Sequence, residues 1–414
     1  MSGVGSDWRP IVRLAARGDG VSDDGRFVPL AAVGDSVDFS ISPPLIMPGP
    51  HHAAPACTHY PACGGCQMQH MDDAAYGNFV IDRISRVLPG GLPDDVRPLA
   101  LSPPRSRRRA SLKALKRGGK LVLGFHSEGT HALIDIVDCP VLHPQLMALL
   151  APLRRLLRAR LKDGQGAGIA LTLSDAGVDV LLANVSAEGL AAIEALTDFA
   201  QGCDLARLSV EGAGGIDTLV ERRQPALIMG GVPVPLPAAP FLQATREGEA
   251  ALVAAVLEAV GDAGRVADLF CGLGTFALPL SLKAAVLAVD AAGPAVTALG
   301  LAARLAGRRV EVQHRDLFRR PLVSVGEGGG KGGELAGLGA VVFDPPRAGA
   351  EAQAKELAAS QVPVVVAVSC NPNTFGRDAK ILVEGGYRIT TLWPVAQFRW
   401  SSHVELVARF ERQP

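Results

Sequence analysis

The sequence predicts an α/β protein whose C-terminal part is a doubly wound, Rossmann-like sheet, preceded by a small β-barrel and a central α+β domain. Strand-like and helix-like segments alternate from about residue 240 onward, the pattern of a parallel sheet with crossover helices. Polar residues follow several of these strands, where open α/β sheets place their ligands. The first 56 residues instead form short apolar runs between tight turns. A length of 414 residues fits two to three domains.

Composition narrows the class of protein. The formal net charge is zero, so any nucleic-acid binding must come from local basic patches. Residues 1–7 show neither a charged n-region nor an apolar h-region, and no apolar run is long enough for a membrane span. We therefore expect a cytoplasmic protein without membrane association, and no obligate protein partner is evident. Seven cysteines in such a chain favour metal binding or catalysis over disulfides.

The N-terminal region, residues 1–56, reads as a barrel followed by a linker. Strands are predicted at Ile11–Leu14, Gly25–Leu30 and Val37–Ile41, separated by Gly-Asp-Gly and Asp-Asp-Gly turns. Five prolines between Pro43 and Pro55 then mark the linker. A barrel of this kind does not by itself indicate a function.

A cysteine array follows the linker. Cys57, Cys63 and Cys66 form a C-x5-C-x2-C motif, and Cys139 follows at a distance in a Cys-Pro pair. Four thiolates suit an iron–sulfur cluster or a structural zinc ion. Zinc ribbons more often carry two C-x2-C pairs, so the spacing favours the cluster, with zinc as the alternative. His59 and His70 lie nearby and are interpreted as bystanders.

Residues 57–238 are predicted to form the central α+β domain. Its basic run from Arg105 to Lys120 contains no acid and is a candidate patch for phosphate contacts. Helices are expected within Leu146–Leu161 and Ala187–Phe199, and Cys203 is interpreted as structural. The predicted strands are Leu121–Phe125, Leu133–Val137, Ile169–Leu173 and Val178–Leu182.

Residues 239–414 carry the strand–helix alternation. A glycine-rich insertion runs from Gly326 to Gly333, and the last two strands, Tyr387–Leu392 and Val404–Phe410, lie close enough to pair antiparallel. The earlier strands are predicted at Arg265–Phe270, Val286–Asp290 and Val310–Gln313, within Ala340–Arg347, where the strand ends in Asp-Pro-Pro, and over the run from Val364 that leads to Cys370.

Cys370 ends the apolar run Val364–Ser369, and Asn371-Pro372 stops that strand. A thiol in this place faces the ligand crevice of a doubly wound sheet. The alternative is a buried cysteine that acts only as a small apolar side chain.

The glycine turn after the first strand of this domain has two interpretations. Gly272, Gly274 and Ala277 fit the dinucleotide pattern G-x-G-x-x-G/A, with Asp290 about 20 residues on, so an NAD-dependent enzyme is a competitor. Two residues argue against an NAD-dependent enzyme. Asp268 lies inside the preceding strand, at a position where methyltransferases often hold the methionine end of S-adenosylmethionine. Cys370 is a candidate nucleophile, which hydride transfer does not need. Further acids near strand ends, Asp316 and Asp344, are also more than a dinucleotide site needs.

Four motifs in this order resemble the RNA uracil-C5 methyltransferases. They are Asp-Leu-Phe-Cys-Gly-Leu-Gly-Thr-Phe (residues 268–276), Asp-Pro-Pro-Arg (344–347), Ser-Cys-Asn-Pro (369–372) and His-Val-Glu (403–405). Within that family the chain is most similar to the iron–sulfur-containing 23S rRNA (uracil-5-)-methyltransferases, over nearly its whole length. The resemblance implies a TRAM-like barrel and an S-adenosylmethionine-dependent methyltransferase domain.

The resemblance also implies roles for particular residues. Cys370 would be the nucleophile and Glu405 the general base, although Val404-Glu405-Leu406 alone reads as a half-exposed strand. The S-adenosylmethionine and uracil sites would be lined by Gln243, Phe270, Thr275, Asp290, Asp316 and Asp344, and a [4Fe-4S] cluster would be held by Cys57, Cys63, Cys66 and Cys139. The chain departs from the family's usual residues at Thr245, Thr275, Asp290, Asp316 and the segment 397–402.

The implied chemistry is addition of a thiolate to uracil C6, methylation at C5, and removal of the C5 proton by a carboxylate. It predicts a thiol with a lowered pKa and an unstacked target base in RNA. 23S rRNA is the expected substrate and tRNA the alternative. An iron–sulfur RNA-binding protein without catalysis is the non-enzymatic alternative, and the intact pair of Cys370 and Glu405 speaks against it.

Overall fold

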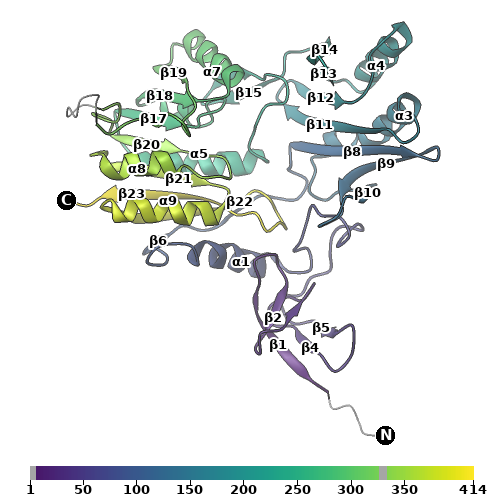
Figure 1. Cartoon of the computed structure of the whole chain (residues 1–414), viewed down its shortest axis with the longest axis horizontal. Coiled ribbons are helices and arrows are strands. Elements are labelled where there is room, and N and C mark those ends of the chain that lie inside the picture. The colour runs from purple at the N-terminus through teal and green to yellow at the C-terminus, as the bar shows by residue number, and fades with distance from the viewer. Residues whose placement is uncertain (1–5, 326–332) are drawn as a thin grey trace.

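The computed structural model describes residues 6–325 and 333–414, so most of the predicted glycine-rich insertion, residues 326–332, lies outside the described residues. The chain forms a small N-terminal sheet, a central domain and a large C-terminal domain (Figure 1). In the described ranges, no helix combines the length and apolarity required to cross a bilayer.

The N-terminal sheet is a curled antiparallel sheet with the strand order β3-β2-β1-β4-β5, as predicted for a small barrel. It closes over a small core that includes Ile11, Val28 and Val37. The predicted strand Val37–Ile41 is shorter than expected, because the carboxylate of Asp38 accepts the N–H of Ser40 and turns the chain. The strands are β1 (Trp8–Leu14), β2 (Gly20–Ser22), β3 (Phe27–Val28), β4 (Ser36–Asp38) and β5 (Leu45–Met47).

The central domain is a seven-stranded sheet in the order β10-β9-β8-β11-β12-β13-β14, covered by helices whose leucines pack into its core. The helix predicted at Leu146–Leu161 is in fact two helices, since Pro152 has no N–H to continue a hydrogen-bonded helix from Ala148. The elements are β8 (Arg109–Arg117), β9 (Lys120–His126), β10 (Leu133–Asp135), α2 (Pro144–Met147), α3 (Leu150–Arg160), β11 (Gly166–Ser174), β12 (Gly177–Ala183), α4 (Leu190–Gly202), β13 (Arg207–Gly212) and β14 (Gly215–Glu221).

The C-terminal sheet has the order β19-β18-β17-β20-β21-β23-β22-β6. Its first five strands are parallel, and β23 enters antiparallel between β21 and β22. The sheet consists of β17 (Arg265–Leu269), β18 (Ala285–Asp290), β19 (Val310–His314), β20 (Ala340–Phe343), β21 (Val364–Ser369), β22 (Tyr387–Ala396) and β23 (Glu405–Arg412), and is joined by β6 (Asp95–Val96) and β7 (Ala100–Leu101).

Helices cover both faces of this sheet, which explains why its central strands are apolar throughout. One face carries α1 (Asp73–Ser85), α8 (Glu351–Ala359) and α9 (Pro372–Glu384). The other carries α5 (Arg246–Val260), α6 (Ala277–Leu280), α7 (Gly293–Leu305) and the hairpin of β15 (Ala226–Met229) and β16 (Val232–Pro235).

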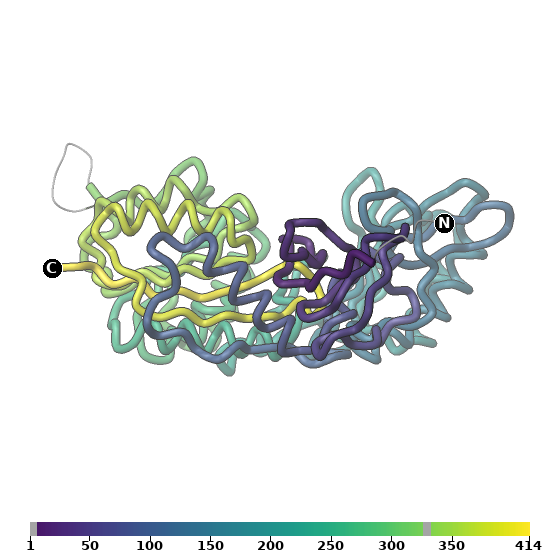
Figure 2. The backbone as a smooth tube through the Cα atoms, turned by 90° about the horizontal axis from the view of Figure 1, so that it is seen from below, coloured from purple at the N-terminus to yellow at the C-terminus, as the bar shows by residue number. Residues whose placement is uncertain are grey.

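The N-terminal third of the chain thus contributes α1, β6 and β7 to the C-terminal unit. Figure 2 shows this blue segment running along the yellow C-terminal strands, and Figure 1 shows the barrel below α1, on one side of the two larger domains. The cysteine segment contacts the loop before the last strand, since the N–H groups of Gln67 and Met68 donate to the carbonyl oxygen of Trp400.

Candidate active site

Cys370 lies where the prediction placed it, between the end of β21 and the start of α9. Asn371 caps α9 through its side-chain oxygen, so the thiol occupies a one-residue junction. Ser369 pairs with Leu406 of β23 in antiparallel register, and the same register sets Cys370 opposite Glu405. The two predicted catalytic residues are therefore brought together.

Glu405 is the first residue of β23 and only 5% exposed. Because β23 runs against the parallel strands, it begins at the edge where those strands end. Gln397, which follows β22, donates its side-chain amide to the Glu405 carboxylate and, at 2.6 Å, to Oε1 of Gln243. Oε1 of Gln397 in turn accepts the N–H of Ala244 at 2.6 Å.

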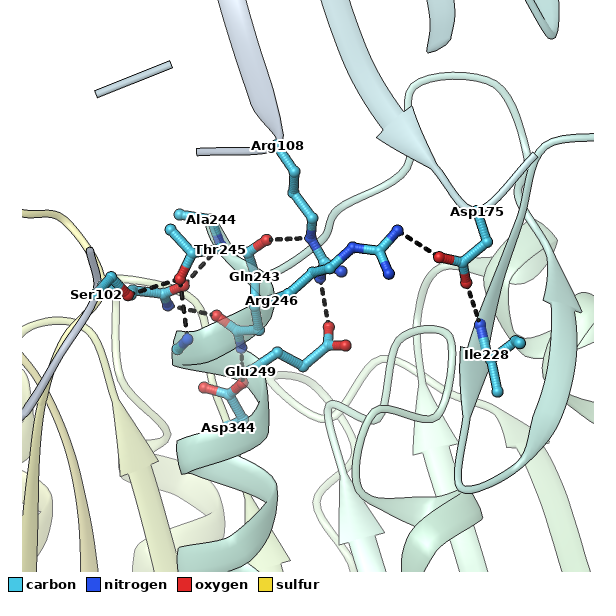
Figure 3. A network of polar contacts seen from close by, with 12 residues as sticks. Ser102, Arg108, Asp175, Ile228, Gln243, Ala244, Thr245, Arg246, Glu249 and Asp344 are labelled. Atoms are coloured by element: carbon cyan, nitrogen blue, oxygen red, sulfur yellow. Dashed lines mark hydrogen bonds and ion pairs between the residues drawn. The ribbon is translucent and has the colours of Figure 1, made fainter. Parts of the chain in front are cut away.

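Gln243 connects this amide pair to Asp344, which follows β20. Its Nε2 lies 3.3 Å from Oδ2 of Asp344 (Figure 3). Its backbone carbonyl accepts Nε of Arg108 at 3.0 Å, and Arg108 also pairs with Glu249 of α5. A continuous polar chain thus runs from Asp344 through Gln243 and Gln397 to Glu405.

The electrostatics of this group correct one expectation. Burial, followed by the charges of Glu405 and Asp344, raises the pKa of Cys370 to about 11. A lowered thiol pKa is therefore wrong for the protein without ligands. Burial likewise raises the pKa of Glu405 to about 8 and that of Asp344 to about 7. Three acidic groups with raised pKa values at one strand edge are typical of a functional site.

The glycine turn after β17 forms a cradle held by Asp290. Oδ2 of Asp290 accepts the N–H of Gly272 at 2.8 Å, and its Oδ1 accepts the N–H of Ala292 at 2.7 Å. Gly274 has φ +92°, and a Cβ there would lie 2.4 Å from a methyl group of Leu299. Thr275 follows in the same turn and is half-buried.

Phe270 and Phe318 form an aromatic pair beside this cradle. Their ring centroids are 5.5 Å apart, and Phe270 has the uncommon backbone angle φ +61°. Oδ1 of Asp316 accepts the N–H of Phe318 at 3.0 Å and so fixes the turn that presents a 49% exposed ring. The sequence analysis did not single out Phe318; its signal was an aromatic residue two positions after a predicted site acid.

Asp268 lies within β17 and is fully buried, and among the described residues neither of its carboxylate oxygens has a hydrogen-bond partner. Burial and the nearby charge of Asp344 raise its pKa well above the usual range. Asp290 ends β18 and Asp344 follows β20, the two strands that flank β17, so carboxyl oxygens lie on both sides of the glycine turn and can accept hydrogen bonds from hydroxyl or ammonium groups of a ligand. The residues present therefore fit S-adenosylmethionine.

The four predicted cysteine ligands line one cavity of about 400 Å³. All four thiols are free, and burial raises the pKa of Cys66 to about 12. Across residues 6–325 and 333–414, no group of three or more His, Cys, Asp or Glu side chains is arranged to hold a metal ion. The cavity nevertheless brings all four predicted thiols together, and thiolates are the ligands that an iron–sulfur cluster or a zinc ion takes. The cavity is lined by Cys57, Cys63, Cys66 and Cys139, among other residues.

The basic run divides into a buried part and an exposed part. Arg108 is 2% exposed and structural, because its guanidinium bonds Gln243 and Glu249. Arg107 and Arg109 line the cysteine cavity, whereas Lys113 and Lys120 are exposed on β8 and β9. The prediction of one phosphate patch is thus wrong for Arg108.

Comparison with known proteins identifies the family. No family model matches the chain. It is 45% identical over 406 residues to an uncharacterised RNA methyltransferase of Zymomonas mobilis, covering 98% of this chain and all of that protein. A Brucella suis protein, also described as an uncharacterised RNA methyltransferase, is 43% identical over 95% of both chains. The chain belongs to the RNA methyltransferase family.

Two further relatives are better defined. The 23S rRNA (uracil(1939)-C(5))-methyltransferase RlmD of Pectobacterium atrosepticum is 29% identical over 88% of this methyltransferase and 82% of RlmD. The crystal structure of Pyrococcus abyssi tRNA (uracil-54, C5)-methyltransferase with S-adenosyl-L-homocysteine superposes with a TM-score of 0.76 at 24% identity, covering 97% and 99% of the two chains. The second match confirms the predicted fold class of this RNA methyltransferase.

Proposed function

We propose that this RNA methyltransferase transfers a methyl group from S-adenosylmethionine to C5 of uridine in RNA, giving 5-methyluridine. The observation that carries the proposal is the register between β21 and β23, which sets Cys370 opposite the buried Glu405. A nucleophile and a carboxylate at one strand edge are the two groups that C5 methylation requires. The names of the Pectobacterium and Pyrococcus relatives support the same reaction.

In this proposal the Cys370 thiolate adds to C6, forming the S–C6 bond and moving the π electrons of the ring toward C5. C5 then takes the methyl group as the bond between methyl carbon and sulfonium breaks, and that electron pair stays on the donor sulfur. Glu405 removes the C5 proton, the C5–C6 double bond re-forms, and the S–C6 bond breaks to release the thiolate. The target uridine must be unstacked for C6 to be reached.

The remaining predicted residues would form the two binding sites. We propose that Asp290 accepts the ribose hydroxyls of the methyl donor and that Phe270 stacks on its adenine, with Phe318 as a second stacking ring. Gln243 and Asp344 would contact the uracil or the methyl donor from the end of β20. Thr275 and Asp316 would line the same two binding sites. A bound sulfonium supplies a positive charge that lowers the pKa of Cys370 toward the working range.

We also propose that Cys57, Cys63, Cys66 and Cys139 hold an iron–sulfur cluster of the [4Fe-4S] type, with zinc as the alternative. Support comes from their spacing and from the single cavity that all four line. Chemical determination of iron, acid-labile sulfide and zinc in anaerobically purified protein separates the two. Equal amounts of iron and sulfide support the cluster, and one zinc per chain without iron overturns it.

The domain division we propose is 1–56 for a TRAM-like barrel, 57–238 for an RNA-binding region, and 239–414 for the methyltransferase domain. Although α1, β6 and β7 fall in the range 57–238, they pack against the sheet of the methyltransferase domain. The exposed Lys113 and Lys120 are candidates for phosphate contacts. We place the reaction in the cytoplasm.

The substrate we propose is 23S rRNA, with tRNA as the alternative. The deciding experiment is mass mapping of methylated uridines in 23S rRNA and tRNA from cells that lack this gene, beside the parent strain. Loss of one 5-methyluridine in 23S rRNA supports the whole proposal. Loss in tRNA keeps the reaction and changes the substrate, and an unchanged set of 5-methyluridines overturns the function.

A further inference from the structure

The loop that delivers Glu405, residues 398–404, is held by the N-terminal third of the chain. The backbone carbonyl of Trp400 accepts the N–H of Gln67 at 2.8 Å and that of Met68 at 3.0 Å. Trp400 has φ +60°, a left-handed conformation that a bulky residue adopts only when its surroundings enforce it. The two hydrogen bonds from the cysteine segment supply that enforcement.

The side chain of Gln67 extends this connection in both directions. Its Oε1 accepts the N–H of Ser402 at 3.3 Å, and its Nε2 donates to the carbonyl of Gly64 at 2.9 Å. Gly64 and Gln67 directly follow Cys63 and Cys66 in the sequence. One glutamine therefore links the turn between two predicted ligands to the loop of the catalytic base.

The first helix holds the same loop from another side. The hydroxyl of the fully buried Tyr76, on α1, lies 3.1 Å from the carbonyl oxygens of both Phe398 and Ser401. Arg399 pairs with Asp73 at the start of α1. The loop is thus fixed at five consecutive residues, 398–402, before Glu405 enters β23.

We infer that Gln67 is a positioning residue for the proton-removal step, coupling the cysteine site to the placement of Glu405. The inference rests on the proposed function, because it assumes that Glu405 takes the C5 proton. Gln67 touches neither Cys370 nor the glycine cradle in the hydrogen bonds of the described residues. Its loss should therefore spare thiol addition and methyl transfer and impair only the last step.

This order of steps makes the inference testable. A misplaced base leaves the methylated RNA attached to Cys370 through the S–C6 bond, whereas a defect in RNA binding or in thiol addition produces no attached species. The full-length protein is incubated with rRNA from cells lacking the gene and with methyl-labelled S-adenosylmethionine. Label in free RNA and label in a denaturant-stable protein–RNA complex are then counted separately, and iron content is measured on each preparation.

Gln67→Ala is expected to slow product release about tenfold and to raise the complex at least tenfold above wild type, with iron content retained. Tyr76→Phe removes a second anchor of the loop and should raise the complex as well, which keeps the test decisive if Gln67→Ala folds poorly. Gln353→Ala is the matched control, since the hydrogen bonds of this buried glutamine within the described residues go to Leu322, outside the loop 398–404. It should behave as wild type.

Slower product without the complex in both loop variants would overturn the inference, as would unchanged kinetics. Failure of the proposed function looks different. In that case wild type gives no labelled uridine at C5, and Glu405→Gln gives no complex either.

Discussion

Gln397 and Glu405 are joined across the turn between β22 and β23 by the side-chain amide of Gln397, which donates to the Glu405 carboxylate and to Oε1 of Gln243. Both residues are buried, so neither amide hydrogen is shared with water. Since Gln243 also reaches Asp344, one amide sets the orientation of the proposed base relative to the acid at the end of β20. The first prediction concerns this amide.

Gln397→Leu replaces the amide donor with an apolar side chain of similar size. The hydrogen bond from Gln397 lowers the pKa of Glu405, so its loss should move that pKa above about 8. We expect kcat to fall roughly tenfold to a hundredfold at pH 7.5 and the rise of kcat with pH to shift to higher pH. Rates measured from pH 6.5 to 9.5 check this, and an unshifted profile would contradict it.

Glu405→Gln tests the burial of the proposed base through stability. The folded protein holds the proton of Glu405 up to about pH 8, against an ordinary value of 4.5, so wild-type stability falls as pH rises between those values. Glutamine keeps the hydrogen-bond acceptor and cannot ionise. The variant should exceed wild type in free energy of unfolding by about 2–4 kcal/mol at pH 8 and by little at pH 5. Urea titrations at both pH values measure the difference, and equal stabilities at pH 8 would argue against a buried, raised acid.

Alkylation of Cys370 by iodoacetamide reports the charges around it. Burial raises the pKa of Cys370 most, and the charges of Glu405 and Asp344 raise it further, so either Glu405→Gln or Asp344→Asn should quicken alkylation of the Cys370 peptide about threefold to tenfold at pH 8. Peptide mass spectrometry separates this thiol from the other six. Cys203 is the internal control, since burial, not a neighbouring acid, raises its pKa. Slower alkylation of Cys370 in both variants would reverse the assigned electrostatics.

Gly274→Ala should damage the cofactor cradle. A Cβ there meets Leu299 at 2.4 Å and needs a positive φ, so we expect a loss of stability of about 1–3 kcal/mol and weaker binding of S-adenosylhomocysteine. Gly261→Ala is the matched control, because Gly261 also has a positive φ but nothing lies within 4 Å of its Cβ position. Calorimetric affinities for the two variants check the prediction, which fails if both bind alike.

Serine substitution at Cys66 or Cys139 should abolish iron binding, because both thiols line the same cavity and each would lose a ligand atom. Cys203→Ser should leave iron content unchanged, since Cys203 lies outside that cavity. Iron is measured on anaerobic preparations of all three variants. Retained iron in both cavity variants would remove these thiols from the ligand set.

The sequence allowed much of the site to be predicted, because its residues fall at the ends of strands. Apolar runs identify those strands, and the residue after each run is read directly, as with Cys370 and Asp344. The network around Gln397 was not predictable in this way. Gln397 and Gln243 are 154 residues apart in the chain, and no local pattern encodes such a contact.

Burial was the second property that local patterns did not reveal. Arg108 stands in a basic run that reads as a surface, yet Gln243 and Glu249, more than 130 residues away, satisfy its guanidinium inside the protein. The prediction of a lowered pKa for the Cys370 thiol failed for the same reason, since the pKa depends first on burial and then on carboxylates brought close by the strand order. Membership of α1, β6 and β7 in the C-terminal sheet likewise required the tertiary structure.

That shared sheet has a consequence for how the protein is made. The segment with α1, β6 and β7 leaves the ribosome well before β22, its pairing partner, is synthesised. At the usual 5–20 residues per second the delay is roughly 15–60 s, during which the buried face of α1 has no sheet to cover it. The cysteine segment next to α1 emerges in the same early interval. Nascent chains of this protein therefore expose the apolar face of α1 throughout this interval, and all four cavity cysteines are synthesised before Cys370 and Glu405.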